Sequence, residues 1–238
     1  MLAPPLCWSC GGPARRRESL CGGCRSSLRR LGPEPALLGG VRVWAPLAYH
    51  GAARELVRAL KFRGAVGVAD AMAAQIVAAA PAGLLDGATV PAGAGISPLA
   101  AGTGVSPLTP GAGTSPLTAG AGVPPVLVPV PIHPRRARRR GFNQAHVLAV
   151  AIARRSGLAL LDCLTRSGAP GSQVGRGRGE RRAGPQGAIG ARPPVSPRAL
   201  LVDDVATTGA TLAACAAALR AAGTRELAAV TFARAPGR

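Results

Sequence analysis

Aromatic and acidic residues are scarce in this sequence. Phe, Trp and Tyr make up 3% of the 238 residues, and Asp and Glu number 10 against 29 Lys and Arg. Hydrophobic residues nevertheless reach 47%, a share that excludes disorder along the whole chain. We therefore expect a folded core built mainly from Ala, Val and Leu, because few aromatic side chains are available to fill it.

The sequence also lacks an uninterrupted apolar run long enough to cross a membrane. The longest apolar region, residues 65–85, contains Asp70, Gln75 and Pro81, whereas a membrane-spanning helix needs about 20 apolar residues. Residues 1–6 have no basic segment and no long apolar stretch, so they do not resemble a secretory signal. These features predict a cytoplasmic protein that is not inserted in a membrane.

The basic residues are nearly all arginines, and they are clustered. The formal net charge is +19, and arginine-rich runs occur at residues 15–17, 29–30, 135–140 and 176–182. Such clusters create local positive potential that attracts phosphate groups. A polyanion is therefore a candidate partner, and the alternative is a set of solvated charged faces without a partner.

Four of the six cysteines form two C-x-x-C pairs, Cys7 with Cys10 and Cys21 with Cys24. Two such pairs facing each other supply the four thiolates of a tetrahedral zinc site. The alternative is two disulfides in a secreted module, but no export signal precedes the pairs and the other two cysteines lie alone in apolar segments. We predict a structural Zn²⁺ ribbon over residues 1–38, folded by its metal because so short a segment cannot bury a core.

Glycine and proline, 33 and 23 residues, include one low-complexity stretch. Ser-Pro-Leu recurs at residues 97–99, 106–108 and 115–117, and no charged residue occurs from 95 to 122. This composition predicts a disordered Gly/Pro insertion over residues 91–123. A β-helix coil is the alternative, which the absence of aspartate and of alternating aliphatic residues disfavours.

The rest of the chain, residues 39–238, predicts alternating strands and helices. Strands are expected at 41–49, 126–130, 158–164, 198–202 and 226–232, and helices at 51–62, 65–80, 143–155 and 210–222. The arginine-rich stretch after residue 130 and the polar residues 165–194 predict loops. Such alternation is typical of an α/β domain with a parallel sheet flanked by helices.

The segment with the clearest chemistry is residues 200–212, LLVDDVATTGATL. An apolar strand ends in two adjacent carboxylates, Asp203 and Asp204, and a loop of small residues leads into a helix. Ligands of open α/β sheets bind at the carboxyl ends of strands, and backbone N–H groups at a helix N-terminus favour phosphate. A sugar phosphate with vicinal hydroxyls suits both halves of this segment. The alternative, a capped helix after a turn, explains the threonines but not the paired carboxylates.

This segment resembles the signature of the type I phosphoribosyltransferases, which use 5-phosphoribosyl 1-pyrophosphate (PRPP). The double C-x-x-C, residues 49–62 (YHGAARELVRALKF), 128–131 (VPVP) and 140–144 (RGFNQ) together resemble the ComF family of competence proteins. The resemblance implies a type I phosphoribosyltransferase-like fold in which Asp203 and Asp204 contact the ribose hydroxyls. It also implies that the 5′-phosphate is held by the loop of Ala206, Thr207, Thr208, Gly209, Ala210 and Thr211.

Further site residues are candidates on the same basis. Mg²⁺ is expected with PRPP, and cations are expected near the departing pyrophosphate. Lys61 and Arg140 are the candidates for these cations, and the alternative for Lys61 is an ordinary surface lysine. Asn143 is expected either to contact the ligand or to cap the helix that follows it.

The polar segment 165–194 and the three histidines give weaker evidence for site residues. Thr165, Arg166 and Gln173 match the family pattern, but residues 181–184 (RRAG) lack its usual asparagine. His50, His133 and His146 show no metal-ligand spacing, so we expect them to be structural.

Two functions are therefore expected as alternatives. The first is a phosphoribosyltransferase that binds Mg·PRPP and transfers the phosphoribosyl group to a nitrogen nucleophile. The second is a non-catalytic PRPP sensor or a DNA-associated factor in competence or recombination. The partners implied are PRPP, DNA or proteins of the competence machinery, and a homo-oligomer is compatible with both functions.

Overall fold

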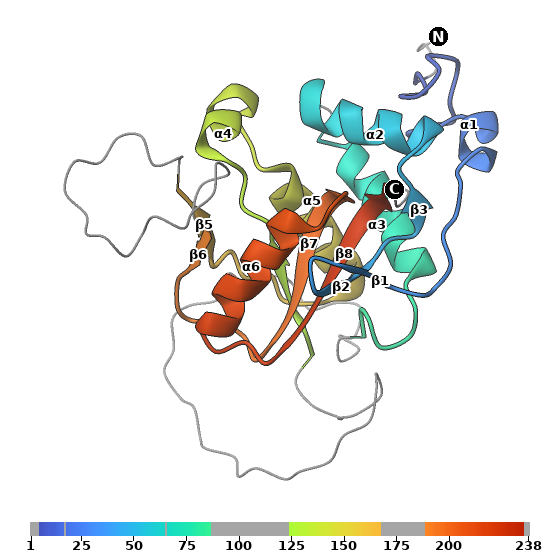
Figure 1. Ribbon diagram of the computed structural model, residues 1–238. Coiled ribbons are helices and arrows are strands. Elements are labelled where there is room, and N and C mark those ends of the chain that lie inside the picture. The colour runs from blue at the N-terminus through green and yellow to red at the C-terminus, as the bar shows by residue number, and fades with distance from the viewer. Residues whose placement is uncertain (1–4, 17, 65, 87–123, 168–188, 236–238) are drawn as a thin grey trace.

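In the computed structural model, a six-stranded sheet lies at the centre of the protein and helices pack on both of its faces (Figure 1). The structure describes residues 5–16, 18–64, 66–86, 124–167 and 189–235. The predicted Gly/Pro insertion over residues 91–123 lies outside these residues.

The sheet is mostly parallel, which confirms the predicted mixed α/β class. Its strand order is β1-β2-β8-β7-β4, and β3 also pairs with β8. Every pair is parallel except β1 with β2. The strands are β1 (Ala36–Leu38), β2 (Val41–Trp44), β3 (Leu47–Ala48), β4 (Val126–Pro129), β7 (Arg198–Ala206) and β8 (Glu226–Arg234).

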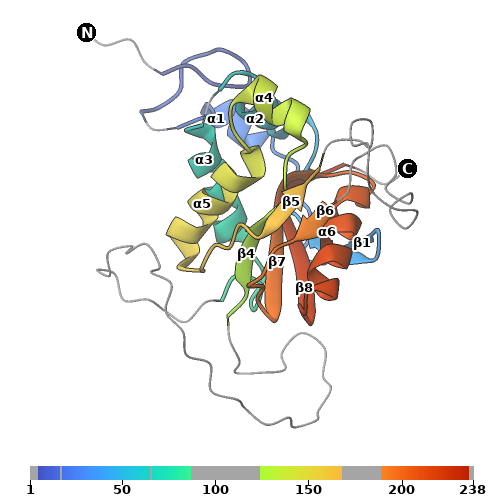
Figure 2. The ribbon, with the colours of Figure 1, turned by 90° about the vertical axis from the view of Figure 1, so that its left-hand side faces the viewer.

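The helices divide between the two faces of the sheet (Figure 2). One face is covered by α2 (Gly51–Phe62), α3 (Val68–Ala79) and α5 (Gln144–Ser156), and the other by α6 (Ala210–Ala221). The Asn143 Oδ1 accepts a hydrogen bond from the N–H of Ala145 at 3.1 Å, so Asn143 caps α5, as one of its two predicted roles requires. Among the described residues, no helix has both the length and the apolar character needed to span a membrane.

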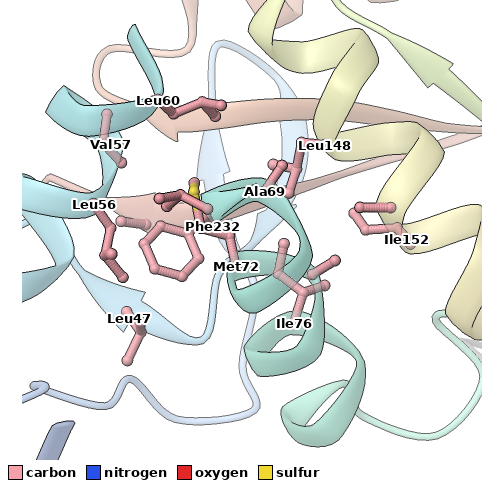
Figure 3. Close-up of a cluster of buried hydrophobic side chains, with 14 of the residues drawn as sticks. Leu47, Leu56, Val57, Leu60, Ala69, Met72, Ile76, Leu148, Ile152 and Phe232 are labelled. Carbon is pink, nitrogen blue, oxygen red and sulfur yellow. The ribbon is translucent and has the colours of Figure 1, made fainter. Parts of the chain in front are cut away.

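The core on the face of α2, α3 and α5 is mostly aliphatic, as the composition predicts (Figure 3). Phe232 of β8 is fully buried at its centre. Burial of each large apolar side chain stabilises the fold by about 1.5–3 kcal/mol, and these contacts fix α2 and α3 against the sheet. The surrounding side chains include Leu47, Leu56, Val57, Leu60, Met72, Ile76, Leu148 and Ile152.

Two predicted strands differ from the structure. The strand expected at 41–49 is divided into β2 and β3 around Pro46, which has no N–H to donate to a neighbouring strand. The strand expected at 158–164 is wrong, because Leu160 makes only an isolated bridge to Leu127. Leu164 instead begins β5 (Leu164–Arg166), which pairs with β6 (Ile189–Ala191) in a small antiparallel sheet on the face of α6.

The predicted loops also contain regular structure. Apart from Leu164, the residues of β5 and β6 fall within the loop predicted at 165–194, of which residues 168–188 are not described. The arginine-rich stretch after residue 130 forms a helix, α4 (Pro134–Arg140), that starts with proline at its first turn and ends at Gly141 with φ +78°. Five of its seven residues are arginines, so it has no apolar stripe from which periodicity could predict a helix.

Three further boundaries are corrected by the structure. The helix expected at 65–80 begins at Val68, and β7 and β8 each run beyond their predicted ends, to Ala206 and Arg234. Two short elements were not predicted, α1 (Gly22–Ser26) and β1. The strand β1 comprises the last three residues of the predicted 1–38 segment and pairs with β2.

Candidate functional site

The candidate site lies at the carboxyl end of β7, where Asp203 and Asp204 are the sixth and seventh residues of the strand. Side chains of successive strand residues point to opposite faces of a sheet. Leu200 and Val202 belong to the core on the side of α2, and Leu201 to the core on the side of α6. By this alternation the Asp204 side chain leaves the strand toward α2 and that of Asp203 toward α6, although both residues line one common cavity.

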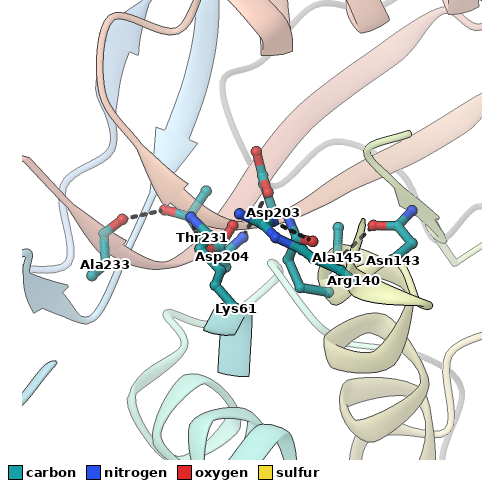
Figure 4. Close-up of polar contacts among 9 residues, drawn as sticks. Lys61, Arg140, Asn143, Ala145, Asp203, Asp204, Thr231 and Ala233 are labelled. Atoms are coloured by element: carbon teal, nitrogen blue, oxygen red, sulfur yellow. Dashed lines mark hydrogen bonds and ion pairs between the residues drawn. The ribbon is translucent and has the colours of Figure 1, made fainter. Parts of the chain in front are cut away.

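Asp204 forms an ion pair with Lys61 at the end of α2 (Figure 4). The Lys61 Nζ lies 2.5 Å from the Asp204 Oδ2, and the Asp204 side chain is 3% exposed. A buried carboxylate without a compensating cation is strongly destabilising. Lys61 is therefore not an ordinary surface lysine, because its ammonium group neutralises the deeper of the two carboxylates.

Asp203 is half-buried and lines a cavity of about 550 Å³. Its Oδ1 accepts a hydrogen bond from the backbone N–H of Asp204 at 2.8 Å. Burial raises the pKa of Asp203 well above its usual value, and the adjacent Asp204 carboxylate raises it further. A group that binds to Asp203 by donating hydrogen bonds or by carrying positive charge relieves this penalty.

The loop after β7 forms one wall of this larger cavity. All six residues predicted to bind the 5′-phosphate, 206–211, line it. Gly209, with φ +78°, is the N-cap of α6, and the first N–H groups of a helix have no intrahelical acceptor. The Ala210 N–H donates to the Thr208 Oγ1 at 3.4 Å. The other N–H groups of the first turn and the hydroxyls of Thr207, Thr208 and Thr211 surround the cavity, an arrangement suited to a phosphate group.

Another part of the lining of the larger cavity is positively charged. Arg135 and Arg136 of α4 and Arg166 of β5 line it together with His133. Sequence reasoning identified Arg166 by resemblance but missed the roles of Arg135 and Arg136, because a run of arginines does not indicate which of its members face inward. A ligand in this cavity therefore meets both a phosphate-binding loop and several guanidinium groups, and Asp203 is the acidic side chain in the lining.

A smaller cavity of about 250 Å³ adjoins the larger one. The two share part of their lining, including His133, Arg136 and Asp203. The smaller cavity adds Lys61, Asp204, Tyr49 and Gln144. Both carboxylates and both cavities thus belong to one continuous site.

Arg140, the second predicted cation, does not line either cavity. Its guanidinium carbon lies 5.0 Å from the centre of the Phe62 ring, and its Nη1 donates to the Gln144 Oε1 at 3.0 Å. Burial lowers the pKa of Arg140, and the charge of Asp204 partly opposes this effect. In this conformation Arg140 connects α2, α4 and α5 behind the site, where it holds Gln144 against the smaller cavity.

The turn between β1 and β2 supports the phosphate-binding loop from outside. A Cβ atom added to Gly209 would lie 2.6 Å from the backbone carbon of Leu38, and one added to Gly39 would lie 2.9 Å from the carbonyl oxygen of Gly209. Such distances are far shorter than ordinary van der Waals contacts. The loop conformation therefore depends on two glycines that touch each other across 170 residues of sequence.

The four N-terminal cysteines of the double C-x-x-C converge at a second site. Their Sγ atoms all lie within 4.8 Å of one another, and those of Cys10 and Cys21 are 3.7 Å apart. In a tetrahedral site with zinc–sulfur bonds of about 2.3 Å, two sulfurs are about 3.8 Å apart. All six cysteines are free thiols, so the disulfide alternative has no support and the cluster can hold a metal ion such as zinc.

Local structure brings these thiols together and prepares them for a metal. The backbone N–H of Trp8 donates to the Ser19 carbonyl oxygen at 3.0 Å, which joins the two C-x-x-C turns. Burial alone would raise the pKa of the Cys7 thiol, but hydrogen bonds from the backbone of Cys10, Cys21 and Ser9 lower it to about 6. The pKa of Cys24 is instead raised to about 12: a hydrogen bond from Ser9 lowers it, but burial and the neighbouring thiols outweigh that effect, so the cluster does not hold all four protons equally. The thiolate is the form that binds metal.

We predict that Gly39→Ala disturbs the phosphate-binding loop, whereas Gly40→Ala does not. Both glycines have positive φ, +56° and +75°, but a Cβ at Gly40 would meet nothing within 4 Å. Each variant should lose about 1–2 kcal/mol of stability from the left-handed backbone. Only Gly39→Ala should shift the backbone amide signals of residues 207–209 in NMR spectra and weaken binding of inorganic phosphate. Equal effects of the two variants on these signals and on phosphate binding would contradict the claim that the turn at Gly39 supports the phosphate-binding loop.

We also predict that Asp203→Asn raises the melting temperature at neutral pH. Because the pKa of Asp203 is raised in the folded state, its contribution to stability is present below the unfolded pKa, about 4, and is lost as the pH rises through the folded pKa. The variant should therefore melt at a higher temperature than the wild type at pH 8, and the difference should vanish near pH 4. Glu34→Gln, which changes an exposed carboxylate, should show no such pattern. A lower melting temperature of Asp203→Asn than of the wild type at pH 8 would refute the claim that the ionised Asp203 carboxylate destabilises the fold.

Comparison with models of known protein families gives no match, and no curated protein matches the chain significantly. The geometry of the site is therefore the evidence from which its function is argued.

Proposed function

We propose that this protein is a ComF-like member of the type I phosphoribosyltransferase family, which binds Mg·PRPP and transfers its phosphoribosyl group to a nitrogen nucleophile. The observation that carries the proposal is that one cavity is lined both by the phosphate-binding loop of residues 206–211 and by the arginines of α4 and β5. PRPP carries phosphate groups at both ends of its ribose and hydroxyls between them, so its chemistry matches both parts of the lining.

The phosphate-binding loop and the arginines would together orient the ligand. The 5′-phosphate would accept hydrogen bonds from the loop of residues 207–211, and the ribose hydroxyls would donate to Asp203. The pyrophosphate would then extend toward Arg135, Arg136 and Arg166, which line the same cavity. Asp204 contributes less directly than the resemblance implies, because its Oδ2 is already paired with Lys61.

The reaction breaks the bond between ribose C1 and the pyrophosphate oxygen and forms a bond from C1 to the acceptor nitrogen, which loses a proton. Positive charge develops on the ribose ring while negative charge accumulates on the pyrophosphate. Fixed positive groups near the departing oxygens stabilise such a transition state, and the three arginines would supply them. The acceptor would enter through the smaller cavity, which Tyr49 and Gln144 line with polar groups.

Magnesium is expected to arrive with the substrate. Mg²⁺ in phosphate-binding sites is commonly held by one or two carboxylates together with substrate phosphates and water. Asp203 offers one carboxylate in the larger cavity, a donor set that fits this pattern. The ion would neutralise pyrophosphate charge, and the protein's own residues would orient the sugar.

The cysteine cluster is proposed to hold one structural zinc ion. Four thiolates leave no open coordination position for catalysis. Hydrogen bonds between the Ala48 N–H and the Arg29 carbonyl oxygen, and between the Leu31 N–H and the Pro46 carbonyl oxygen, attach the ribbon to the segment around β3. The metal would thus hold the N-terminal segment in place ahead of β1, whose turn supports the phosphate-binding loop.

A specific observation also favours the second candidate function, a PRPP-sensing or DNA-associated factor. Arg138 and Arg139 of α4 are exposed and do not line either cavity. They add positive charge outside the site that phosphoribosyl transfer does not need. Arginine–phosphate contacts with DNA would show a steep dependence on salt concentration.

Asp203→Asn is expected to weaken Mg·PRPP binding by about tenfold to a hundredfold, because hydrogen bonds to a charged group contribute roughly 1.5–3 kcal/mol. Isothermal titration calorimetry with Mg·PRPP measures this loss, and Glu34→Gln should bind like the wild type. Unchanged affinity of Asp203→Asn would remove Asp203 from the site. Pyrophosphate release in the presence of ammonia or nucleobases would identify an enzyme, and PRPP binding without any turnover would favour the sensor.

The metal proposal is tested separately. Purified protein should contain about one zinc ion per chain, and Cys10→Ser should lose it and melt at a lower temperature because the metal stabilises the folded ribbon. Elemental analysis measures the zinc content. Cys163→Ala, which removes a thiol outside the cluster, should retain the metal, and wild-type protein without zinc would refute the site.

A further inference from the structure

His133 lies at the junction of the two cavities. It lines both the larger and the smaller one, as Arg136, Arg166 and Asp203 also do. The residue is half-buried and follows the loop at the carboxyl end of β4, directly before α4. A side chain in this position can reach a ligand that extends from the phosphate-binding loop toward the arginines.

A hydrogen bond fixes the orientation of its imidazole ring. The His133 Nδ1 accepts a hydrogen bond from the backbone N–H of Arg135 at 3.2 Å. In neutral imidazole one nitrogen accepts and the other carries the proton, so the proton of His133 resides on Nε2. The ring therefore presents a hydrogen-bond donor at its free end and cannot act there as a base while the Arg135 contact is kept.

The surroundings keep the ring neutral in the absence of ligand. Partial burial lowers the pKa of His133, and the positive charges of Arg166, Arg135, Arg136 and Arg138 lower it further. A neutral donor avoids adding another full charge to a wall that already holds several guanidinium groups. It still provides a directed hydrogen bond to an oxygen atom of a ligand.

We propose that the His133 Nε2–H donates a hydrogen bond to the pyrophosphate group of PRPP, on the oxygens that gain negative charge as the bond to ribose C1 breaks. This inference rests on the proposed phosphoribosyl transfer and assigns a ligand-binding role to a residue that sequence reasoning expected to be structural. Pyrophosphate is favoured over the 5′-phosphate because His133 directly precedes the helix that carries Arg135 and Arg136, whereas the phosphate-binding loop is a separate segment between β7 and α6.

Two substitutions separate this role from helix capping. His133→Asn keeps a side-chain acceptor for the Arg135 N–H, since Asn is a favourable N-cap residue, but is too short to reach into the cavity. His133→Gln gives up the short capping geometry and places an amide N–H near the position of Nε2. A residue that only caps α4 would tolerate Asn better than Gln, whereas a ligand donor would tolerate Gln better than Asn.

The test is calorimetric titration of both full-length variants with Mg·pyrophosphate and with inorganic phosphate, after thermal melting has established that each is folded. We expect His133→Asn to bind pyrophosphate about tenfold to a hundredfold more weakly than the wild type, the range for a hydrogen bond to a charged group. His133→Gln should stay within about threefold of the wild type, a difference smaller than one such bond. Inorganic phosphate, which we assign to the loop of residues 207–211, should bind equally to all three proteins.

Each other result has a distinct meaning. Wild-type affinity in His133→Asn, or weaker binding in Gln than in Asn, would overturn the donor role while leaving the proposed function intact. Failure of the wild type to bind either Mg·pyrophosphate or Mg·PRPP would overturn the proposed function itself, and the inference with it. If His133→Asn does not fold, the Nε2 proton resonance of wild-type His133 decides: a shift on addition of Mg·pyrophosphate supports the contact, and an unchanged resonance refutes it.

Discussion

The ion pair between Lys61 and Asp204 is the interaction on which the site depends. Two adjacent carboxylates end the apolar part of β7, and both cannot remain charged at low cost near a buried core. Lys61 compensates Asp204 from α2 at a distance of 2.5 Å, and Asp203 is left on the other face of the strand, against the larger cavity. The packing of α2 and α3 around Phe232 holds Lys61 in place, so the hydrophobic core determines which carboxylate meets a ligand.

Most of the fold follows from local sequence patterns. The strand at 198–202 and the helices at 51–62 and 210–222 were predicted close to their observed positions, because burial and periodicity agree there. The exceptions have physical causes. Pro46 divides a strand that hydrophobicity alone makes continuous, and α4 carries charge on every side, so its helix is defined by Pro134 and Gly141 at its ends rather than by an apolar stripe.

The site was predictable only in part. The sequence places Asp203, Asp204 and the threonine loop beside one another, and the structure brings that loop to a cavity. The sequence alone does not reveal that Lys61 pairs with Asp204 or that Arg140 packs on Phe62, because side-chain pairing between distant elements depends on how helices dock. The contact between Gly39 and Gly209 was missed for the same reason: a glycine shows where the backbone can bend but not what it touches.

A crystal structure of the protein with Mg·PRPP tests the central claim most directly, namely that one cavity holds a phosphorylated pentose between the loop after β7 and the arginines of α4 and β5. The account predicts the 5′-phosphate on the backbone amides of residues 207–211, the ribose hydroxyls on Asp203 and the Lys61–Asp204 pair intact. A bound ligand elsewhere, with the loop vacant and Asp203 paired to Arg136, would contradict it.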